Sequence, residues 1–220
     1  MHKVKILEIY SLTHNVKRFT VEKPKDYVFT PGQATEVAIN KEGWEDKKRP
    51  FTFTSLPQEE HLEFTIKTYH DHKGVTNELD GLLSGDELLI DNAWGAIHYN
   101  GPGIFIAGGA GITPFIAIFR MLEKENKLEG NKLIFSNKKQ QDVILESYFA
   151  ELLGDNFIST LTHEKVDDHL NEKIGMEFLK KHVESYSQNF YICGPDQMVK
   201  DLSSYLETLG AKPDGITFEK

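Results

Sequence analysis

A glycine-rich turn in the middle of the chain has the residue types and spacing of a loop that binds a pyrophosphate. It follows an apolar stretch at 104–107 and contains, in order, Gly109, Ala110, Gly111, Thr113 and Pro114. Glycines let the backbone approach an anion closely, and the first turn of a following helix adds unpaired N–H groups and a positive dipole end. Pro114 suits this first turn because its missing N–H would have no partner there. A tight strand-to-helix turn without a ligand is the alternative interpretation.

A second turn with possible chemistry ends a later apolar strand. Cys193, Gly194 and Pro195 follow the apolar residues 190–192. In a parallel sheet the ligand lies beyond the carboxyl ends of the strands, so Cys193 would sit where a nicotinamide ring could lie. Taken alone, the pattern favours a buried apolar cysteine. Because Cys193 is the only cysteine, the chain has no intramolecular disulfide, no thiolate-held zinc site and no four-cysteine iron–sulfur cluster.

Three polar residues bear on which nicotinamide nucleotide, NADH or NADPH, such a site would bind. Ser136, Asn137 and Lys138 follow an apolar stretch that begins near 133, without the acidic residue that typically holds the ribose of NAD. Ser136 and Lys138 could instead receive a 2′-phosphate. The sequence therefore favours NADPH over NADH.

A second set of anion-binding signals lies in the first hundred residues. Arginine is scarce beside lysine in this chain, and Arg49 stands at the start of a predicted strand, where its guanidinium could contact a phosphate with two hydrogen bonds. Gly74, Val75 and Thr76 open a short helical stretch, whose first turn could bind another anion. The alternatives are a solvated arginine and an ordinary N-cap at Thr76.

The elements that must position these residues fall into two groups. In the first half, short β-branched and aromatic segments are separated by turn residues, which predicts six antiparallel strands in a closed or nearly closed Greek-key barrel. These strands are expected at 4–9, 17–22, 34–39, 51–55, 62–67 and 87–91, with one helix at 75–83.

After residue 103 the pattern changes to apolar strands that alternate with helices. The strands begin near 104, 133, 157, 190 and 216, and the helices cover 114–125, 145–153, 176–182 and 196–209. This alternation predicts a five-stranded parallel α/β nucleotide-binding domain. We expect a barrel domain at 1–100 and an α/β domain at 101–220.

Composition excludes several classes of protein. The chain has 220 residues, 39% of them hydrophobic, and a net charge of −9, which argues against nucleic acid and anionic membranes as partners. The uncharged stretch 103–119 is broken by glycines and a proline and is shorter than the roughly 20 apolar residues that cross a bilayer. Charges near Met1 argue against a signal peptide, so we expect a cytoplasmic location. We also expect a monomer. His70 and His72 could bind a metal, but a solvated turn is favoured and no metal is expected.

Together these motifs resemble the ferredoxin–NADP⁺ reductase family, in its compact form without an iron–sulfur domain. The resemblance covers essentially the whole chain. Residues 49–52 match the R-x-Y-S/T flavin motif, with Phe51 in place of tyrosine, and 74–76 match the start of a pyrophosphate-binding helix. Residues 109–114 and 193–195 match the two nicotinamide-nucleotide motifs. Phe51 lacks the hydroxyl that a tyrosine would offer the flavin.

The resemblance implies that the chain binds FAD and NAD(P)H. Arg49 would pair with the FAD pyrophosphate, Phe51 would lie against the isoalloxazine, and the Thr52 hydroxyl would approach flavin N5. The expected FAD-binding residues are Arg49, Pro50, Phe51, Thr52, Thr65, Ile66, Lys67, Gly74, Val75 and Thr76. The expected nucleotide-binding residues are Gly109, Ala110, Gly111, Thr113, Pro114, Ser136, Asn137, Lys138, Cys193, Gly194 and Pro195.

The implied function is that of an FAD-dependent oxidoreductase, which takes a hydride from NAD(P)H and passes electrons to flavodoxin, ferredoxin or a similar carrier. The expected catalytic residues are Thr52, Cys193 and Glu219, the last matching a carboxylate near the family's C-terminus. The sequence stops at Lys220, short of the aromatic that stacks on the flavin in many members, and alternation turns Phe218 away from the flavin. Two alternatives remain: a reductase of free flavin, and a redox sensor that binds both cofactors without turnover.

Overall fold

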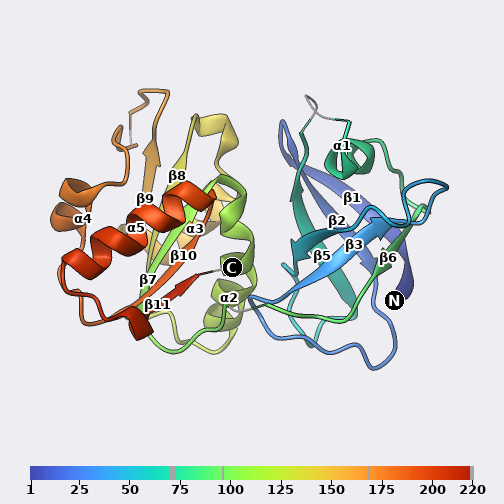
Figure 1. Ribbon diagram of the computed structural model, residues 1–220, viewed down its shortest axis with the longest axis horizontal. Helices are drawn as coiled ribbons and strands as arrows, with labels where there is room; N and C mark the ends of the chain where they lie inside the picture. The colour runs from blue at the N-terminus through green and yellow to red at the C-terminus, as the bar shows by residue number, and fades with distance from the viewer. Residues whose placement is uncertain (70–72, 96, 168, 219–220) are drawn as a thin grey trace.

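The computed structural model describes residues 1–69, 73–95, 97–167 and 169–218, which form two parts side by side (Figure 1). The first part is an antiparallel sheet with a single helix. Its elements are β1 (His2–Thr13), β2 (Val16–Glu22), β3 (Ala34–Ile39), β4 (Arg49–Thr52), β5 (His61–Lys67), α1 (Val75–Asp80) and β6 (Glu87–Ile90). The strands follow the order β4-β3-β6-β1-β2-β5, and an isolated bridge between Phe53 and Phe64 joins the two ends. The predicted six-stranded barrel is confirmed.

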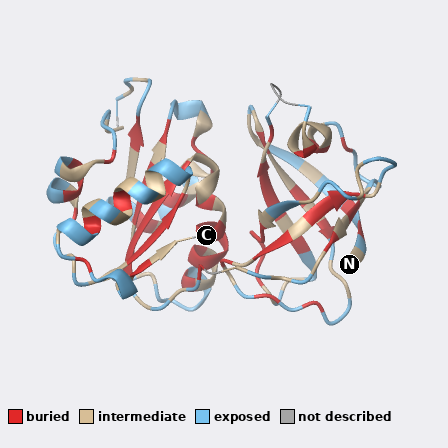
Figure 2. Ribbon diagram, viewed as in Figure 1, coloured by how far each residue is buried: buried red, intermediate tan, exposed pale blue. Residues whose placement is uncertain are grey.

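The barrel closes around an apolar core because its strands alternate. In β1, Val4 and Ile6 are buried and Lys5 between them is exposed, as the two-residue period of a strand requires. Phe53 and Phe64 meet inside the barrel with ring centroids 5.2 Å apart. In Figure 2 the barrel strands carry buried residues interspersed with more exposed ones.

Several boundaries differ from the prediction: β1 extends beyond 4–9 at both ends, β4 ends at Thr52 rather than 55, and two further differences have clear physical reasons. The helix α1 ends at Asp80 rather than 83, where Gly81, a residue of low helix propensity, follows as its C-cap. The strand β4 begins at Arg49 rather than 51 and includes Pro50. A proline is tolerated there because β4 is the terminal strand in the order of this sheet.

The second part is a parallel sheet with helices on both faces. Its elements are β7 (Gly103–Gly108), α2 (Thr113–Lys124), β8 (Lys132–Asn137), α3 (Glu146–Leu153), β9 (Phe157–Leu161), α4 (Met176–His182), β10 (Asn189–Cys193), α5 (Asp196–Thr208) and β11 (Ile216–Phe218). The strand order is β11-β10-β7-β8-β9, and every neighbouring pair runs parallel. The predicted five-stranded nucleotide-binding fold is confirmed.

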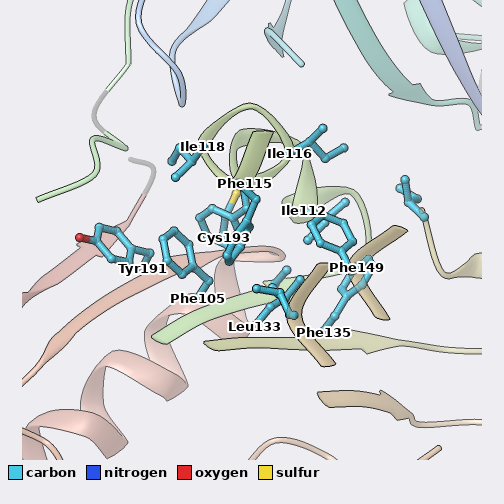
Figure 3. Packing of buried hydrophobic residues seen from close by; sticks show 14 of the residues in the cluster. Phe105, Ile112, Phe115, Ile116, Ile118, Leu133, Phe135, Phe149, Tyr191 and Cys193 are labelled. Carbon is cyan, nitrogen blue, oxygen red and sulfur yellow. The ribbon is translucent and has the colours of Figure 1, made fainter. Parts of the chain in front are cut away.

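Alternate residues of the central strands pack against different helices. Phe105 of β7 joins a cluster with Phe115 of α2 and Phe149 of α3, as Figure 3 shows. Its neighbour Ile104 joins the opposite cluster, which includes Phe178 of α4 and residues of α5. The strands are buried on both faces, as is usual for parallel sheets. Within the residues that the structure describes, no helix has the length and apolar character needed to cross a membrane.

The helix α2 contributes to the contact between the two parts. Val16 of β2 belongs to the same buried cluster as Ile118 of α2. Beside this cluster, Arg120 of α2 donates a hydrogen bond to the Thr54 carbonyl at 2.7 Å and pairs with Glu59 at 2.7 Å. The barrel is therefore packed against the helix that begins at the glycine-rich turn.

Candidate functional site

A cleft of about 820 Å³ lies between the barrel and the α/β part. It is lined by most of the residues that the sequence singled out, and they come from four strands, two helices and the adjoining turns of both parts. From the barrel these are Pro50, Phe51, Thr52, Thr65, Ile66, Lys67 and Thr76. From the α/β part they are Gly109, Ala110, Gly111, Thr113, Ser136, Asn137, Lys138, Cys193, Gly194 and Pro195. Motifs separated by more than a hundred residues thus share one cleft.

The topology of the parallel sheet brings the two nucleotide motifs together. The strands β7 and β10 are neighbours, although β8 and β9 lie between them in the sequence, so the strand order reverses at this point. Ligands of such sheets bind in the crevice at this reversal, beyond the carboxyl ends of the strands. The glycine-rich turn follows β7 and the Cys193 turn follows β10, so both turns lie at that crevice.

The two glycines of the first turn meet different requirements. Gly109 has φ +54°, a left-handed conformation that favours glycine, and a Cβ there would meet nothing within 4 Å. A Cβ on Gly111 would instead lie 2.2 Å from the carbonyl oxygen of Cys193 and 2.6 Å from the amide nitrogen of Gly194. The absence of a side chain at Gly111 therefore lets the two motifs touch, backbone against backbone.

A short 3₁₀ turn, Gly109–Ile112, precedes α2, so the α-helix begins at Thr113. The Thr113 hydroxyl donates a hydrogen bond to the Ala110 carbonyl at 3.0 Å and thereby fixes the turn. Pro114 is buried at the start of α2 and is not part of the cleft lining. Pro114 occupies the first turn of α2, as predicted. Its expected contact with a nucleotide stays a prediction.

Asn137, at the end of β8, has an unsatisfied side chain that suits a ligand. Its backbone carbonyl accepts a hydrogen bond from the Thr162 amide at 3.0 Å. Its side chain is 5% exposed, and within the described part of the chain neither its amide nitrogen nor its amide oxygen has a partner. Buried polar atoms without partners are uncommon, and a donor and an acceptor in a cleft suit a ribose or an amide. The α/β wall of the cleft therefore fits a nicotinamide nucleotide.

The barrel wall presents hydroxyls and an aromatic ring to the cleft. Thr52 and Thr65 are buried, and the bridge between Phe53 and Phe64 places them opposite each other on adjacent strands. Phe51 is half-buried and packs against the barrel core at the edge of the cleft. A flat ring beside two hydroxyls is a suitable surface for the isoalloxazine of a flavin.

Three residues expected at the pyrophosphate do not line the cleft. Arg49 is exposed, and its guanidinium donates a hydrogen bond to the Lys48 carbonyl at 2.7 Å. Val75 is buried in the barrel core, and Gly74 is the N-cap of α1 beside it. Thr76, one position further, is in the lining. The role of Arg49 toward a pyrophosphate stays a prediction.

Cys193 is buried and contacts both the cleft and the apolar core. Figure 3 shows its sulfur beside Phe115 of α2. It lies in the cleft lining and also packs as a small apolar residue, and its place beside a nicotinamide stays a prediction. Glu219 lies outside the described residues, as do His70 and His72. The described part of the chain contains no group of three or more side chains that could hold a metal ion.

Phe218 lies where strand alternation placed it. It is the last residue of β11 and packs against the cluster that contains Phe190 and Leu206. It is not part of the cleft lining.

Several residues of the cleft were missed by the sequence analysis. They are Tyr69, Trp94, Gly108, Asp142, Thr162, Asp196, Met198 and Val199. Trp94 is 38% exposed, and its backbone pairs with Ala34, which is the neighbour of Thr52 across the sheet. Its side chain therefore extends the barrel wall beyond Thr52. No periodic pattern marked this segment.

Asp142 brings a carboxylate to the region where none was expected. One of its oxygens accepts a hydrogen bond from the Lys139 amide at 3.1 Å, and the other lies 3.6 Å from the His14 ring in the barrel. It stands in a short 3₁₀ turn, Gln140–Asp142, that returns it to the cleft beside Asn137 and Lys138. The position of Asp142 in the sequence, five residues after the end of β8, did not indicate that its side chain would line the cleft.

Comparison with known proteins agrees with the two-part organisation. The profile of an FAD-binding domain family matches residues 1–142, and the profile of an oxidoreductase NAD-binding domain family matches residues 105–204. The chain is 24% identical to the ferredoxin–NAD(P)⁺ reductase component of a naphthalene 1,2-dioxygenase system from Pseudomonas putida, over 96% of this chain and 66% of the relative. It is 28% identical to NADH–cytochrome b5 reductase 1 of Arabidopsis thaliana, over 96% of this chain and 80% of the relative.

Solved structures show the same fold. A ferredoxin NADP⁺ reductase from Neisseria gonorrhoeae, with bound FAD and NADP, superposes with a TM-score of 0.87 at 24% identity and covers 99% of this chain and 97% of its own. The FAD- and NAD-binding domain of a nitric oxide dioxygenase from Vibrio cholerae gives 0.86 at 20% identity, with coverage of 99% and 97%. With the matches to both domain families and the cleft that joins them, the chain belongs to the FAD-binding domain family, with an oxidoreductase NAD-binding domain after it, and has the ferredoxin–NADP⁺ reductase-like fold.

Proposed function

We propose that this chain is an FAD-dependent reductase that accepts a hydride from NAD(P)H and passes the electrons to a separate acceptor. The observation that carries the proposal is the single cleft in which the flavin motif around Thr52 faces the turns at Gly111 and Cys193. Neither part alone brings a flavin surface and a nucleotide surface together. Residues 1–100 would form the FAD-binding domain and residues 101–220 the NAD(P)-binding domain.

In this proposal the cofactors supply the chemistry, since bound FAD accepts two electrons from a nicotinamide and can release them singly. The residues of the chain would bind the two cofactors and orient them toward each other. The buried side-chain amide of Asn137 would form hydrogen bonds with the nucleotide. The contact between Gly111 and Cys193 would fix the position of the nicotinamide. Thr52 would place a hydroxyl at the flavin ring from the opposite wall. Such positioning can account for a large part of a rate enhancement.

The electron acceptor is inferred from the kind of relatives that the chain matches. The chain spans between 58% and 66% of the length of the first curated relatives it matches, which are reductase or electron-transfer components of oxygenase systems. We propose a small one-electron carrier of the ferredoxin or flavodoxin kind. The monomeric state and the cytoplasmic location expected from the sequence stay predictions.

The choice of nucleotide depends on a balance of charges in the cleft. Lys138 is exposed beside Asn137 and could contact a 2′-phosphate, whereas the Asp142 carboxylate in the same lining would repel one. We retain the preference for NADPH that the sequence suggested. Steady-state kinetics with both nucleotides test it, and a kcat/KM about tenfold higher for NADH would refute it.

The visible spectrum of the purified chain, followed by anaerobic titration, tests the proposed function. We expect bound FAD whose absorbance is bleached by a stoichiometric amount of NADPH or NADH and returns on adding a one-electron acceptor. A colourless protein that reduces added flavin would instead indicate the free-flavin reductase. A flavoprotein that neither nucleotide reduces would indicate the sensor and exclude the enzyme.

A further inference from the structure

A buried polar stripe runs from the cleft to the contact between the two parts of the molecule. Because Phe53 and Phe64 face the barrel core, alternation places their polar neighbours on the other face of the same strand pair. These neighbours are Thr52, Thr54, Glu63 and Thr65. Thr52 and Thr65 line the cleft at one end, whereas Glu63 reaches Arg120 at the other.

The carboxylate of Glu63 is fixed between two arginines. One of its oxygens lies 3.6 Å from the Arg120 guanidinium, and the other lies 3.6 Å from Arg18 Nε. Arg120 is itself held by the Thr54 carbonyl at 2.7 Å. The Thr54 hydroxyl, which is fully buried, donates a hydrogen bond to Glu63 Oε1 at 2.9 Å.

These contacts determine the direction of the next hydrogen bond. A carboxylate only accepts, and a threonine hydroxyl has a single proton to donate. Since Thr54 gives its proton to Glu63, the 3.3 Å contact between the hydroxyl oxygens of Thr54 and Thr65 requires that Thr65 be the donor. Thr65 then has no proton left for the cleft and offers only lone pairs to a ligand.

We propose that Glu63, acting through Thr54, is a positioning residue that holds the Thr65 hydroxyl as a pure hydrogen-bond acceptor for an N–H group of the flavin ring. Thr65 stands opposite Thr52, the residue that approaches the ring in the proposed function, so both hydroxyls face the same part of the ligand. The ring carries an N–H donor that such an acceptor would recognise. This inference rests on the proposed binding of FAD.

The inference is tested by measuring flavin affinity, which requires no turnover. The full chain is freed of bound flavin and then titrated with FAD and, separately, with riboflavin. In Glu63→Gln the new amide can donate to Thr54, which frees Thr54 to donate to Thr65 and turns the Thr65 proton toward the cleft. We expect Glu63→Gln and Thr65→Val each to weaken both flavins by about three- to tenfold, the effect of one hydrogen bond. Thr65→Ser, which keeps the hydroxyl, should restore the affinity to within about twofold.

Two comparisons separate positioning from mere packing. Glu59 contacts the same Arg120 guanidinium, but among the described residues it makes no hydrogen bond to the hydroxyl of Thr54 or Thr65. Glu59→Gln should therefore leave flavin affinity within about twofold of the wild type. The double variant Glu63→Gln with Thr65→Val should bind no more weakly than Thr65→Val alone, because both changes act through one hydroxyl.

The outcomes are distinct. Equal losses in Glu59→Gln and Glu63→Gln, or additive losses in the double variant, would overturn the inference, because packing or an independent effect would then explain them. Wild-type affinity in Glu63→Gln would overturn it as well. A wild-type chain that binds neither FAD nor riboflavin would refute the proposed function itself, which is a separate result.

Discussion

Substituting Gly111 by alanine should separate nucleotide chemistry from flavin binding. A Cβ at this position would lie 2.2 Å from the Cys193 carbonyl oxygen, whereas ordinary contact begins at 3.4 Å. The two turns must therefore move apart by about 1.2 Å, the difference between these two distances. The obstacle is backbone on both sides, so no flexible side chain can move aside to absorb the change.

The expected size of the effect follows from this displacement. A misplacement of about 1 Å at a site of chemistry can cost roughly a hundredfold in rate. We therefore expect Gly111→Ala to reduce bound flavin about a hundredfold more slowly with NAD(P)H, or to need correspondingly more nucleotide. The barrel wall at Thr52 and Thr65 is untouched, so flavin content should equal that of the wild type.

Gly154→Ala is a matched control outside the cleft lining. The φ of +52° at Gly154 imposes a left-handed backbone on alanine, which costs about 1–2 kcal/mol. Overpacking at Gly111 costs a similar amount, about 1–3 kcal/mol. A Cβ on Gly154 meets nothing within 4 Å, so this variant loses stability without changing either turn of the cleft.

Anaerobic stopped-flow reduction at several nucleotide concentrations compares the two variants, with flavin content from absorbance and stability from thermal unfolding. Slow reduction confined to Gly111→Ala would support the geometric argument. Wild-type reduction in Gly111→Ala would refute it, and equal slowing in both variants would show that lost stability explains the effect.

Four further predictions concern single side chains. Arg49→Ala should weaken FAD by about 1.5–3 kcal/mol but leave riboflavin, which lacks a phosphate, unchanged, and unaltered FAD binding in a titration would contradict the assignment. Trp94→Ala should weaken FAD and riboflavin alike by about 0.5–1.5 kcal/mol, whereas Trp44→Ala, outside the cleft lining, should change neither. A loss of nucleotide binding alone in the Trp94 variant would place that ring elsewhere. Cys193→Ala should slow flavin reduction in stopped flow while FAD content stays intact, and a wild-type rate would leave this residue a packing role only. Burial lowers the pKa of His182 below its ordinary value of 6.5, so the unfolded chain takes up the proton first as pH falls. The stability that this residue contributes is present above pH 6.5 and is lost as pH falls through the lower folded pKa. The unfolding temperature should therefore decline less on acidification in His182→Asn than in the wild type. Parallel declines in the two proteins would refute this.

The elements that the sequence predicted well are those whose burial pattern is regular. The strand Ala34–Ile39 and the helix Met176–His182 have the predicted bounds, because their apolar residues follow the period of a single element. The helix α1 was predicted three residues too long because Leu82 and Leu83 continue its spacing beyond Gly81. Leu83 is 71% exposed, so its spacing did not reflect burial.

The cleft was predictable to the extent that its residues belong to local motifs. Trp94 and Asp142 reach it by routes that no short motif records: a backbone pairing with Ala34 in one case and a 3₁₀ turn in the other. Glu63 does not line the cleft but was missed in a similar way, since a charged residue in an alternating strand is usually part of a solvated face. The packing of Arg120 from the other part of the molecule makes it part of a partly buried network.

The glycine-rich motif illustrates how a sequence pattern can be correct for more than one reason. Gly109 is required for its backbone conformation, whereas Gly111 is required because the chain of another motif passes against it. The second requirement arises only where β7 and β10 are adjacent, which is the point at which the strand order of the sheet reverses. The reversal creates the crevice and also presses its two turns together. A glycine at 111 therefore joins the two nucleotide motifs into one surface, and any side chain there would open that surface whatever nucleotide binds it.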